Sequence, residues 1–262
     1  MKMQIYCLIC ALLNIKKMVY VTIFWMSTDL LTVVLKRMKM EIMNSKINTV
    51  IFDLDGTLLD TLKDLQISTN YALKKHGMKE RTLDEVRCFV GNGVAKLIER
   101  AIDGGLENKE YAEVLEDFKN HYKLHCNDNT APYDGIPALL SELKKSGMKM
   151  AIVSNKFDAA VKELNSLYFA DFIQVAIGES EKIKKKPAPD TVNAAIEELG
   201  SCVTECVYVG DSDVDIMTAK NVGIPCISVT WGFRDEDELK ASGGTVFADV
   251  PADILKICAS EE

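Results

Sequence analysis

The sequence predicts an α/β protein in which a doubly wound parallel sheet carries a small, inserted all-helical domain. From residue 136 onward, short apolar segments rich in β-branched residues alternate with amphipathic segments of helical periodicity. This alternation is typical of a parallel sheet covered by helices on both faces. A further apolar segment, 47–52, comes earlier in the chain. Residues 61–131, which lie between the two regions, show helical patterns only and are too many for a loop, so a separate small domain is expected there.

The first expected strand ends in an acidic turn that has the features of a functional site. Asp53 and Asp55 follow the apolar segment directly, and Gly56 comes next. A buried carboxylate is costly, so two of them at a strand end need a cation, a proton or a charged ligand nearby. Gly56 permits a turn at positive φ and lets main-chain N–H groups approach a ligand between the acids.

Apolar residues at helical spacing and turn signals divide the segment 61–131 into helices. Gly77 supplies a C-terminal stop for the first of them. Thr82 to Glu85 has the pattern of a helix start, and Gly91 and Gly93 interrupt the periodicity before the next helix. The expected helices are 62–76, one starting near residue 82, 94–102 and about 109–126, with a linker at 131–135.

The remainder of the chain is expected to alternate regularly between strand and helix, which gives the core the ranges 46–60 and 132–262. The expected strands are 148–153, 172–177, 206–209, 226–229 and 246–247. The expected helices are 136–146, 157–168, 189–199, 214–221 and 252–258.

Polar residues stand at the carboxyl ends of three expected strands. Besides the acidic turn at Asp53, the second strand stops at Ser154, and a later one stops at Gly210 and Asp211. Ligands of open α/β sheets bind beyond the carboxyl ends of the strands. Asp53, Asp55, Ser154 and Asp211 are therefore expected to converge on one site.

Four short motifs resemble the signatures of the haloacid dehalogenase superfamily of aspartyl-phosphate phosphohydrolases. They occur in the expected order and on the expected elements, between about residues 46 and 258. The resemblance implies a Rossmann-like core with an inserted helical cap. The matching residues are Asp53-Leu54-Asp55-Gly56-Thr57, then Ser154, then Lys186 before Pro187-Ala188-Pro189, and finally Gly210-Asp211-Ser212-Asp213-Val214-Asp215.

The resemblance implies a role for each site residue. Asp53 would attack phosphorus in line and become an aspartyl phosphate. Asp55 would protonate the leaving oxygen and then take a proton from the attacking water. Lys186 would supply fixed positive charge to the phosphoryl oxygens. The phosphate-binding residues implied are Thr57, Ser154, Asn155 and Lys186.

The implied cofactor is Mg²⁺, which prefers hard oxygen ligands. Asp53, the main-chain carbonyl of Asp55 and Asp211 resemble such ligands. Asp215 would be a further ligand or would orient one. Whether Asp211 or Asp215 binds the metal directly stays open at this point.

The resemblance also limits which reactions are expected. Halide-cleaving members lack an acid at the position of Asp55, so a phosphate ester or anhydride is the expected substrate class. The helical segment is similar to the mobile cap of the phosphoglycolate phosphatase group, and Gly91, Asn92 and Gly93 would face the leaving group. We expect a Mg²⁺-dependent phosphatase of a small phosphorylated metabolite that forms an aspartyl phosphate. The alternatives are an inorganic pyrophosphatase, a nucleotide phosphatase, or a non-catalytic receiver-like module phosphorylated on Asp53.

Each site residue also has a purely structural interpretation. Lys186 could belong to a solvated charge run with Lys184 and Lys185, and Ser154 could cap the next helix. The acids from Asp211 onward could form an acidic first helical turn. His121 and His125 lie four residues apart on a helix, but no third ligand is spaced to join them, so a solvated face is expected.

Composition limits the partners and the compartment. The chain carries 31 basic and 39 acidic residues. Residues 1–39 hold six of the basic residues and one of the acids, so residues 40–262 carry 25 basic and 38 acidic residues, a net charge of −13. Nucleic acid and anionic lipid are therefore not expected partners of the core. Its 8 cysteines lack the spacing of a disulfide framework, which favours a reducing, cytoplasmic setting. Residues 1–45 differ in composition from the rest and are interpreted as an upstream extension that follows from a mis-called start, with a membrane anchor as the alternative. The oligomeric state is not predicted.

Overall fold

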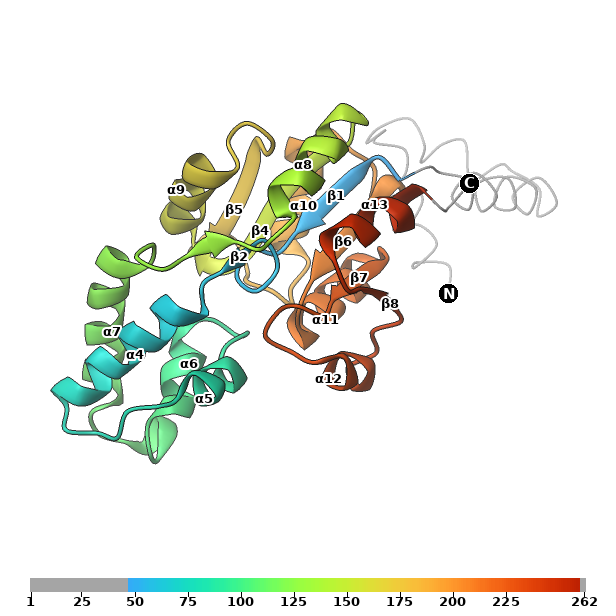
Figure 1. Ribbon diagram of the computed structural model, residues 1–262. Coiled ribbons are helices and arrows are strands. Elements are labelled where there is room, and N and C mark those ends of the chain that lie inside the picture. Colours follow the sequence, from blue (N-terminus) through green and yellow to red (C-terminus); the bar gives the residue numbers. More distant parts are fainter. Residues whose placement is uncertain (1–46, 260–262) are drawn as a thin grey trace, which may run out of the picture. The chain divides into compact units, whose positions relative to one another are not determined.

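The computed structural model describes residues 47–259 of the chain, and its centre is a six-stranded parallel sheet with the order β5-β4-β1-β6-β7-β8 (Figure 1). Phe52 in β1 pairs with Ile152 in β4 and with Val209 in β6. These three central strands therefore run in register to the same edge of the sheet, where Asp53 follows. The strands are β1 (Thr49–Phe52), β4 (Lys149–Phe157), β5 (Val175–Glu179), β6 (Cys206–Gly210), β7 (Cys226–Val229) and β8 (Val246–Ala248).

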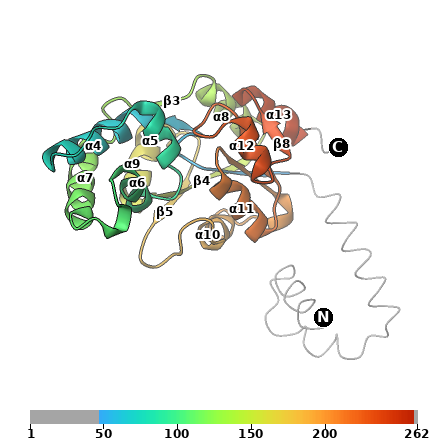
Figure 2. The ribbon, with the colours of Figure 1, turned by 90° about the horizontal axis from the view of Figure 1, so that it is seen from below.

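Helices cover both faces of the sheet, as Figure 2 shows for α8 and α13 on one side and α10 and α11 on the other. Side chains alternate across a strand, so Val50 and Phe52 of β1 join one apolar cluster and Ile51 joins the other. The predicted doubly wound sheet is thereby confirmed. The helices are α8 (Ile136–Lys145), α9 (Asp158–Tyr168), α10 (Asp190–Glu198), α11 (Asp213–Val222), α12 (Glu236–Ala241) and α13 (Pro251–Ala259).

A group of helices lies between β1 and β4 in the sequence, and we call residues 61–131 the helical insert. It has its own apolar cluster, which includes Leu65, Leu97 and Phe118 and is separate from the two clusters of the sheet. The insert is all-helical, as predicted, with α4 packed along α7 (Figure 1). Its helices are α4 (Leu62–Lys75), α5 (Leu83–Phe89), α6 (Val94–Ala101) and α7 (Tyr111–His125), with a short 3-10 turn η2 (Gly105–Glu107).

Two short strands that the sequence did not predict connect the insert to the core. β2 (Leu59–Asp60) and β3 (Ala131–Pro132) pair antiparallel, with Leu59 opposite Pro132. Two residues are too few to show the alternation of apolar and polar side chains that is typical of a strand. The sequence therefore held no periodic pattern that could predict β2 or β3. The pairing holds the outgoing and returning chains of the insert side by side.

Two further elements differ from the sequence prediction. β4 continues past Val153 to Phe157, so Ser154 lies inside the strand and α9 begins only at Asp158. α12 was not predicted, although Asp235 and Glu238 form a capping box at its start. A 3-10 turn, η3 (Val203–Glu205), precedes β6.

The expectations for residues 1–45, including the alternatives of a mis-called start and a membrane anchor, lie outside the described residues. Within 47–259, none of the helices has the length and apolar character needed to cross a membrane.

Candidate active site

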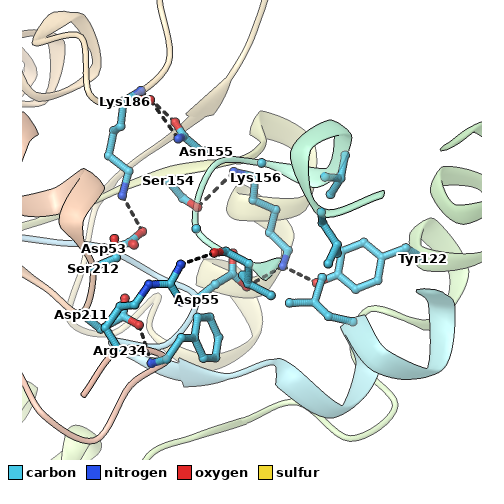
Figure 3. Close-up of a pocket in the computed structure, with 17 residues that line it drawn as sticks. Asp53, Asp55, Tyr122, Ser154, Asn155, Lys156, Lys186, Asp211, Ser212 and Arg234 are labelled. Carbon is cyan, nitrogen blue, oxygen red and sulfur yellow. Dashed lines mark hydrogen bonds and ion pairs between the residues drawn. The ribbon is translucent and has the colours of Figure 1, made fainter. Parts of the chain in front are cut away.

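Most of the predicted site residues line a cavity of about 60 Å³ between the carboxyl edge of the sheet and the helical insert (Figure 3), whereas Thr57, Asn92 and Asp215 are not among its lining residues. Both the core and the insert contribute to its wall. The charged side chains that line it are Asp53, Asp55, Lys156, Lys186, Asp211 and Arg234.

Lys186 lies at the centre of the acidic cluster. Its Nζ is 2.8 Å from Oδ1 of Asp53 and 2.8 Å from Oδ1 of Asp215. Lys186 is buried, whereas Lys184 and Lys185 are exposed, so the interpretation of Lys186 as part of a solvated charge run is wrong. Burial lowers the pKa of Lys186, but its attraction to Asp215 and Asp53 outweighs burial and raises that pKa overall. The lysine is therefore a fixed positive charge.

Asp53 is a buried carboxylate at the end of β1. Its Oδ1 accepts a hydrogen bond from the main-chain N–H of Leu54 at 2.6 Å. Burial and repulsion from Asp215 raise its pKa well above the ordinary value, although Lys186 opposes the shift. Additional positive charge beside this carboxylate would favour its ionised form.

Asp211 and Asp215 differ in how many hydrogen bonds their carboxylate oxygens accept. The four hydrogen bonds to Asp215 come from Lys186 and Tyr208 on Oδ1 and from the main chain and hydroxyl of Ser212 on Oδ2. Asp211 accepts one short bond on Oδ2, from the main-chain N–H of Phe233 at 2.7 Å. Burial and repulsion from Asp215 raise the pKa of Asp211. Asp211 thus retains oxygen capacity for a further ligand.

The cluster fits a hard divalent cation. Among the described residues, carboxylate oxygens of Asp53, Asp211 and Asp215 lie within 4.8 Å of one another, and all three residues are buried. Three acids with one lysine between them leave excess negative charge, and oxygen donors are those that Mg²⁺ prefers. Asp215 also belongs to the capping box of α11, and Asp213 lies in the first turn of the same helix, whereas Asp211 precedes it. The interpretation as an acidic first turn therefore applies to Asp213 and Asp215 but not to Asp211.

Ser154 and Asn155 reach the site from β4. Ser154 is buried, and its hydroxyl accepts a hydrogen bond from the main-chain N–H of Lys156 at 3.1 Å. No side chain caps α9, so the interpretation of Ser154 as a helix cap is wrong. The amide of Asn155 donates to the main-chain oxygen of Lys186 at 3.0 Å and accepts from its N–H at 2.8 Å. Asn155 thereby fixes the loop that carries Lys186.

Thr57 and the glycine loop complete the predicted set. The Thr57 hydroxyl is 3.4 Å from Oδ1 of Asp211. Gly91 and Gly93 line the cavity with positive φ angles of 122° and 83°, whereas Asn92 is not among the lining residues. The loop thus presents main chain to the cavity at two positions where larger side chains would be strained.

His121 and His125 are not among the residues that line the cavity. Their rings stack at 4.3 Å, Nδ1 of His121 is 3.0 Å from the Ser68 hydroxyl, and Nδ1 of His125 is 2.7 Å from Asp128. Both rings therefore have partners other than a metal within the described structure.

Residues 50–229 match the model of the family described as haloacid dehalogenase-like hydrolase.

This chain belongs to that family. A phosphoglycolate phosphatase of Aquifex aeolicus is 35% identical over 185 residues, which cover 70% of this chain and 85% of the relative. An N-acetylmuramic acid 6-phosphate phosphatase of Pseudomonas aeruginosa is 28% identical, with 81% of this chain and 95% of the relative covered. A solved structure from Lactobacillus delbrueckii, named as a candidate phosphoglycolate phosphatase, has 34% identity and a TM-score of 0.76 over 81% of this chain and 98% of its own.

Three cavity residues of this haloacid dehalogenase-like hydrolase were missed at the sequence level. Lys156 Nζ lies 2.7 Å from Oδ1 of Asp55 and donates to the Tyr122 hydroxyl at 2.6 Å (Figure 3). Lys156 lies two residues after Ser154, and alternate residues of a strand face the same side of the sheet. A predicted strand that continued through Lys156 would therefore have placed Lys156 on the same side as Ser154. Tyr122 and Arg234 had no local signal.

Arg234 holds the glycine loop of the hydrolase against the core. Its Nη1 and Nη2 donate to the carbonyl oxygens of Arg87 and Val90 at 3.1 and 2.6 Å. Arg87 returns a bond from Nη1 to the carbonyl of Phe233 at 3.3 Å. A Cβ on Gly91 would lie 3.2 Å from Nη2 of Arg234, so the loop and the arginine are closely fitted.

Proposed function

We propose that this chain is a divalent-cation-dependent phosphatase that hydrolyses a small phosphate monoester through an aspartyl phosphate on Asp53. The observation that carries the proposal is the convergence of Asp53, Asp211 and Lys186, from three separate chain segments, on one buried cluster. Family membership favours hydrolysis over a receiver-like module. The proposed reaction has two steps.

In the first step, Asp53 attacks phosphorus and the bond to the leaving oxygen breaks. Lys186 and the Leu54 N–H hold Oδ1 of Asp53, which leaves Oδ2 as the attacking atom. Asp55 gives its proton to the leaving oxygen, so an alcohol departs. In the second step Asp55 takes a proton from water, which attacks the phosphoryl group and releases Asp53.

We propose Mg²⁺ as the cation, held by Asp53, the main-chain carbonyl of Asp55, and Asp211. Asp215 orients the site instead of binding metal, because its two oxygens already accept four hydrogen bonds. When bound, the cation offsets the repulsion between carboxylates and phosphate. The raised pKa values of Asp53 and Asp211 fit a cluster that needs this charge.

The phosphoryl oxygens would be bound by Ser154 and Lys186, with Thr57 beside Asp211. Lys186 is buried and carries positive charge, which has a large effect in a low-dielectric site. Asn155 is proposed to act through Lys186, since it exchanges two hydrogen bonds with the main chain of that residue.

The helical insert, residues 61–131, is proposed to act as a mobile cap domain on the core ranges 46–60 and 132–262. The loop at Gly91, Asn92 and Gly93 would face the leaving group. A small cavity favours a compact substrate, and a relative named phosphoglycolate phosphatase at 35% identity favours phosphoglycolate.

Phosphate release from a panel of substrates tests the proposal. With Mg²⁺, phosphoglycolate should exceed N-acetylmuramic acid 6-phosphate, pyrophosphate and a nucleoside monophosphate in kcat/KM. Asp53→Asn should abolish turnover of all of them, while the exposed acid variant Asp84→Asn should keep the normal rate. Near-normal turnover by Asp53→Asn would refute the nucleophile, and one phosphate per chain without turnover would favour a receiver-like module.

A further inference from the structure

The ammonium group of Lys156 joins the helical insert to the acid assigned to proton transfer. It contacts Oδ1 of Asp55 at 2.7 Å and the Tyr122 hydroxyl oxygen at 2.6 Å (Figure 3). Tyr122 lies on α7 of the insert, whereas Asp55 and Lys156 belong to the core. The position of the Lys156 side chain therefore depends on contacts with both the core and the helical insert.

Lys156 is held in place on three sides. Besides its two polar partners, the Tyr122 ring lies beneath it with its centroid 4.8 Å from Nζ, and only 4% of the lysine side chain is exposed. A lysine side chain is flexible and loses considerable rotamer freedom when fixed. Tyr122 therefore contributes both a polar contact and a ring contact to the position of Lys156.

Tyr122, in turn, is fixed within the insert. It is buried in the apolar cluster of the insert, and its ring stacks on Phe118 with centroids 5.3 Å apart. Its hydroxyl therefore reaches Lys156 only when the insert is docked on the core. Movement of the insert away from the core would remove one polar partner and the ring face from Lys156 together.

We propose that Tyr122 and Lys156 are positioning residues that orient Asp55 toward the leaving oxygen when the helical insert is docked. The inference rests on the proposed function, because it assigns a purpose to Asp55 within that reaction. Lys156 holds Oδ1 of Asp55, so Oδ2 is left to face the substrate. Without the Tyr122 hydroxyl, Lys156 has one polar partner fewer and Asp55 is held less firmly.

A second contact between insert and core allows docking to be separated from positioning. Arg234 binds the carbonyls of Arg87 and Val90 and is not among the partners of Asp55. Removal of the Tyr122 hydroxyl should therefore leave this docking contact in place, and the ring packing of Tyr122 would remain in a phenylalanine.

The test compares two phosphate esters whose leaving groups differ in how much they depend on protonation. The alkoxide that leaves phosphoglycolate must be protonated, whereas the phenolate that leaves p-nitrophenyl phosphate departs readily without a proton. For Tyr122→Phe we expect kcat/KM on phosphoglycolate to fall about tenfold, since a hydrogen bond to a charged group is lost. On p-nitrophenyl phosphate the same variant should stay within about twofold of wild type.

Tyr111→Phe is the matched control. Tyr111 lies on the same helix, but its hydroxyl donates to the carbonyl of Ala95 inside the insert at 3.0 Å. Both esters should be turned over at the wild-type rate by this variant. Thermal unfolding of each variant checks that the fold is retained.

Two variants of Lys156 extend the test. Lys156→Met removes the charge at similar length and should lower phosphoglycolate turnover more than Tyr122→Phe does, whereas Lys156→Arg should restore part of the loss. Equal losses on both esters, or no loss on phosphoglycolate, would overturn the positioning role and leave the proposed phosphatase standing. If the wild type hydrolyses neither ester, the proposed function itself fails.

Discussion

A substitution at Asp64 tests what stabilises the junction between the helical insert and the two chain segments that connect it to the core. This carboxylate in the first turn of α4 is 1% exposed. It accepts hydrogen bonds from the main-chain N–H groups of Asn129 and Thr130 and from both of their side chains, at 2.8 to 3.0 Å. One buried charge thus joins the outgoing and returning chains of the insert next to β2 and β3.

The substitution Asp64→Asn keeps the shape and removes the charge. One oxygen remains as an acceptor, but an NH₂ group now faces donors of Thr130, whose hydroxyl can turn to the carbonyl of Cys126, 3.0 Å away. The main-chain N–H of Thr130 has no such substitute. An unpaired buried donor costs about 1–3 kcal/mol, and the loss of charge weakens the remaining bonds, so the variant should lose about 2–4 kcal/mol of unfolding free energy.

For a chain of this size the loss corresponds to a fall in Tm of about 5–12 °C. Urea unfolding and calorimetry measure it, with the exposed Asp84→Asn in α5 as a control that should not change. Hydrogen exchange should be faster at Asn129 and Thr130 in Asp64→Asn. An unchanged unfolding midpoint would show that the Asp64 contacts are not what stabilises this junction.

Three further predictions concern charge. Lys186→Met should lower kcat at least about 10³-fold, because Asp53 loses its buried ionic partner, whereas the exposed Lys185→Met should keep normal activity; a normal rate for Lys186→Met would contradict the assigned role. Removal of divalent cations with a chelator should abolish phosphate release, and Mg²⁺ should restore it; persistent activity in excess chelator would exclude a metal requirement. Hydrogen bonds to Asp117 and Glu110 raise the pKa of His76, so its stabilising effect should be complete below pH 6.5 and be lost as pH rises through the folded-state pKa. The difference in unfolding free energy between wild type and His76→Gln should shrink over that rise, and a difference that grows with pH would have the wrong sign.

The sheet and the core of the site could be predicted because their signals are local. Each strand of the sheet was a short apolar segment. Asp53 and Asp211 directly follow β1 and β6, and Ser154 directly follows the apolar part of β4. Parallel pairing then brought those ends to one edge, as the register of Phe52 with Ile152 and Val209 shows. Among Lys184, Lys185 and Lys186, only the motif with the following prolines favoured Lys186. The burial that distinguishes Lys186 from the other two is a property of the tertiary structure.

The remaining residues depend on how the insert meets the core. Tyr122 is one of many apolar-face residues in the pattern of α7, and only docking brings it to Lys156. Arg234 follows β7 in a loop without periodicity, and its partners lie on the insert. Tyr122 and Lys156 are 34 residues apart, and Arg234 is 147 and 144 residues from Arg87 and Val90. Contacts at these separations leave no trace in local spacing, so the structure was needed to find them.

Trapping the intermediate tests the central claim most directly. The enzyme is mixed with phosphoglycolate and Mg²⁺, quenched in acid and reduced with borohydride, which converts an aspartyl phosphate to homoserine. Mass spectrometry of the peptide from β1 should then find homoserine at position 53 in wild type, and none in Asp53→Asn. Homoserine at another aspartate, or continued turnover by Asp53→Asn, would contradict the account.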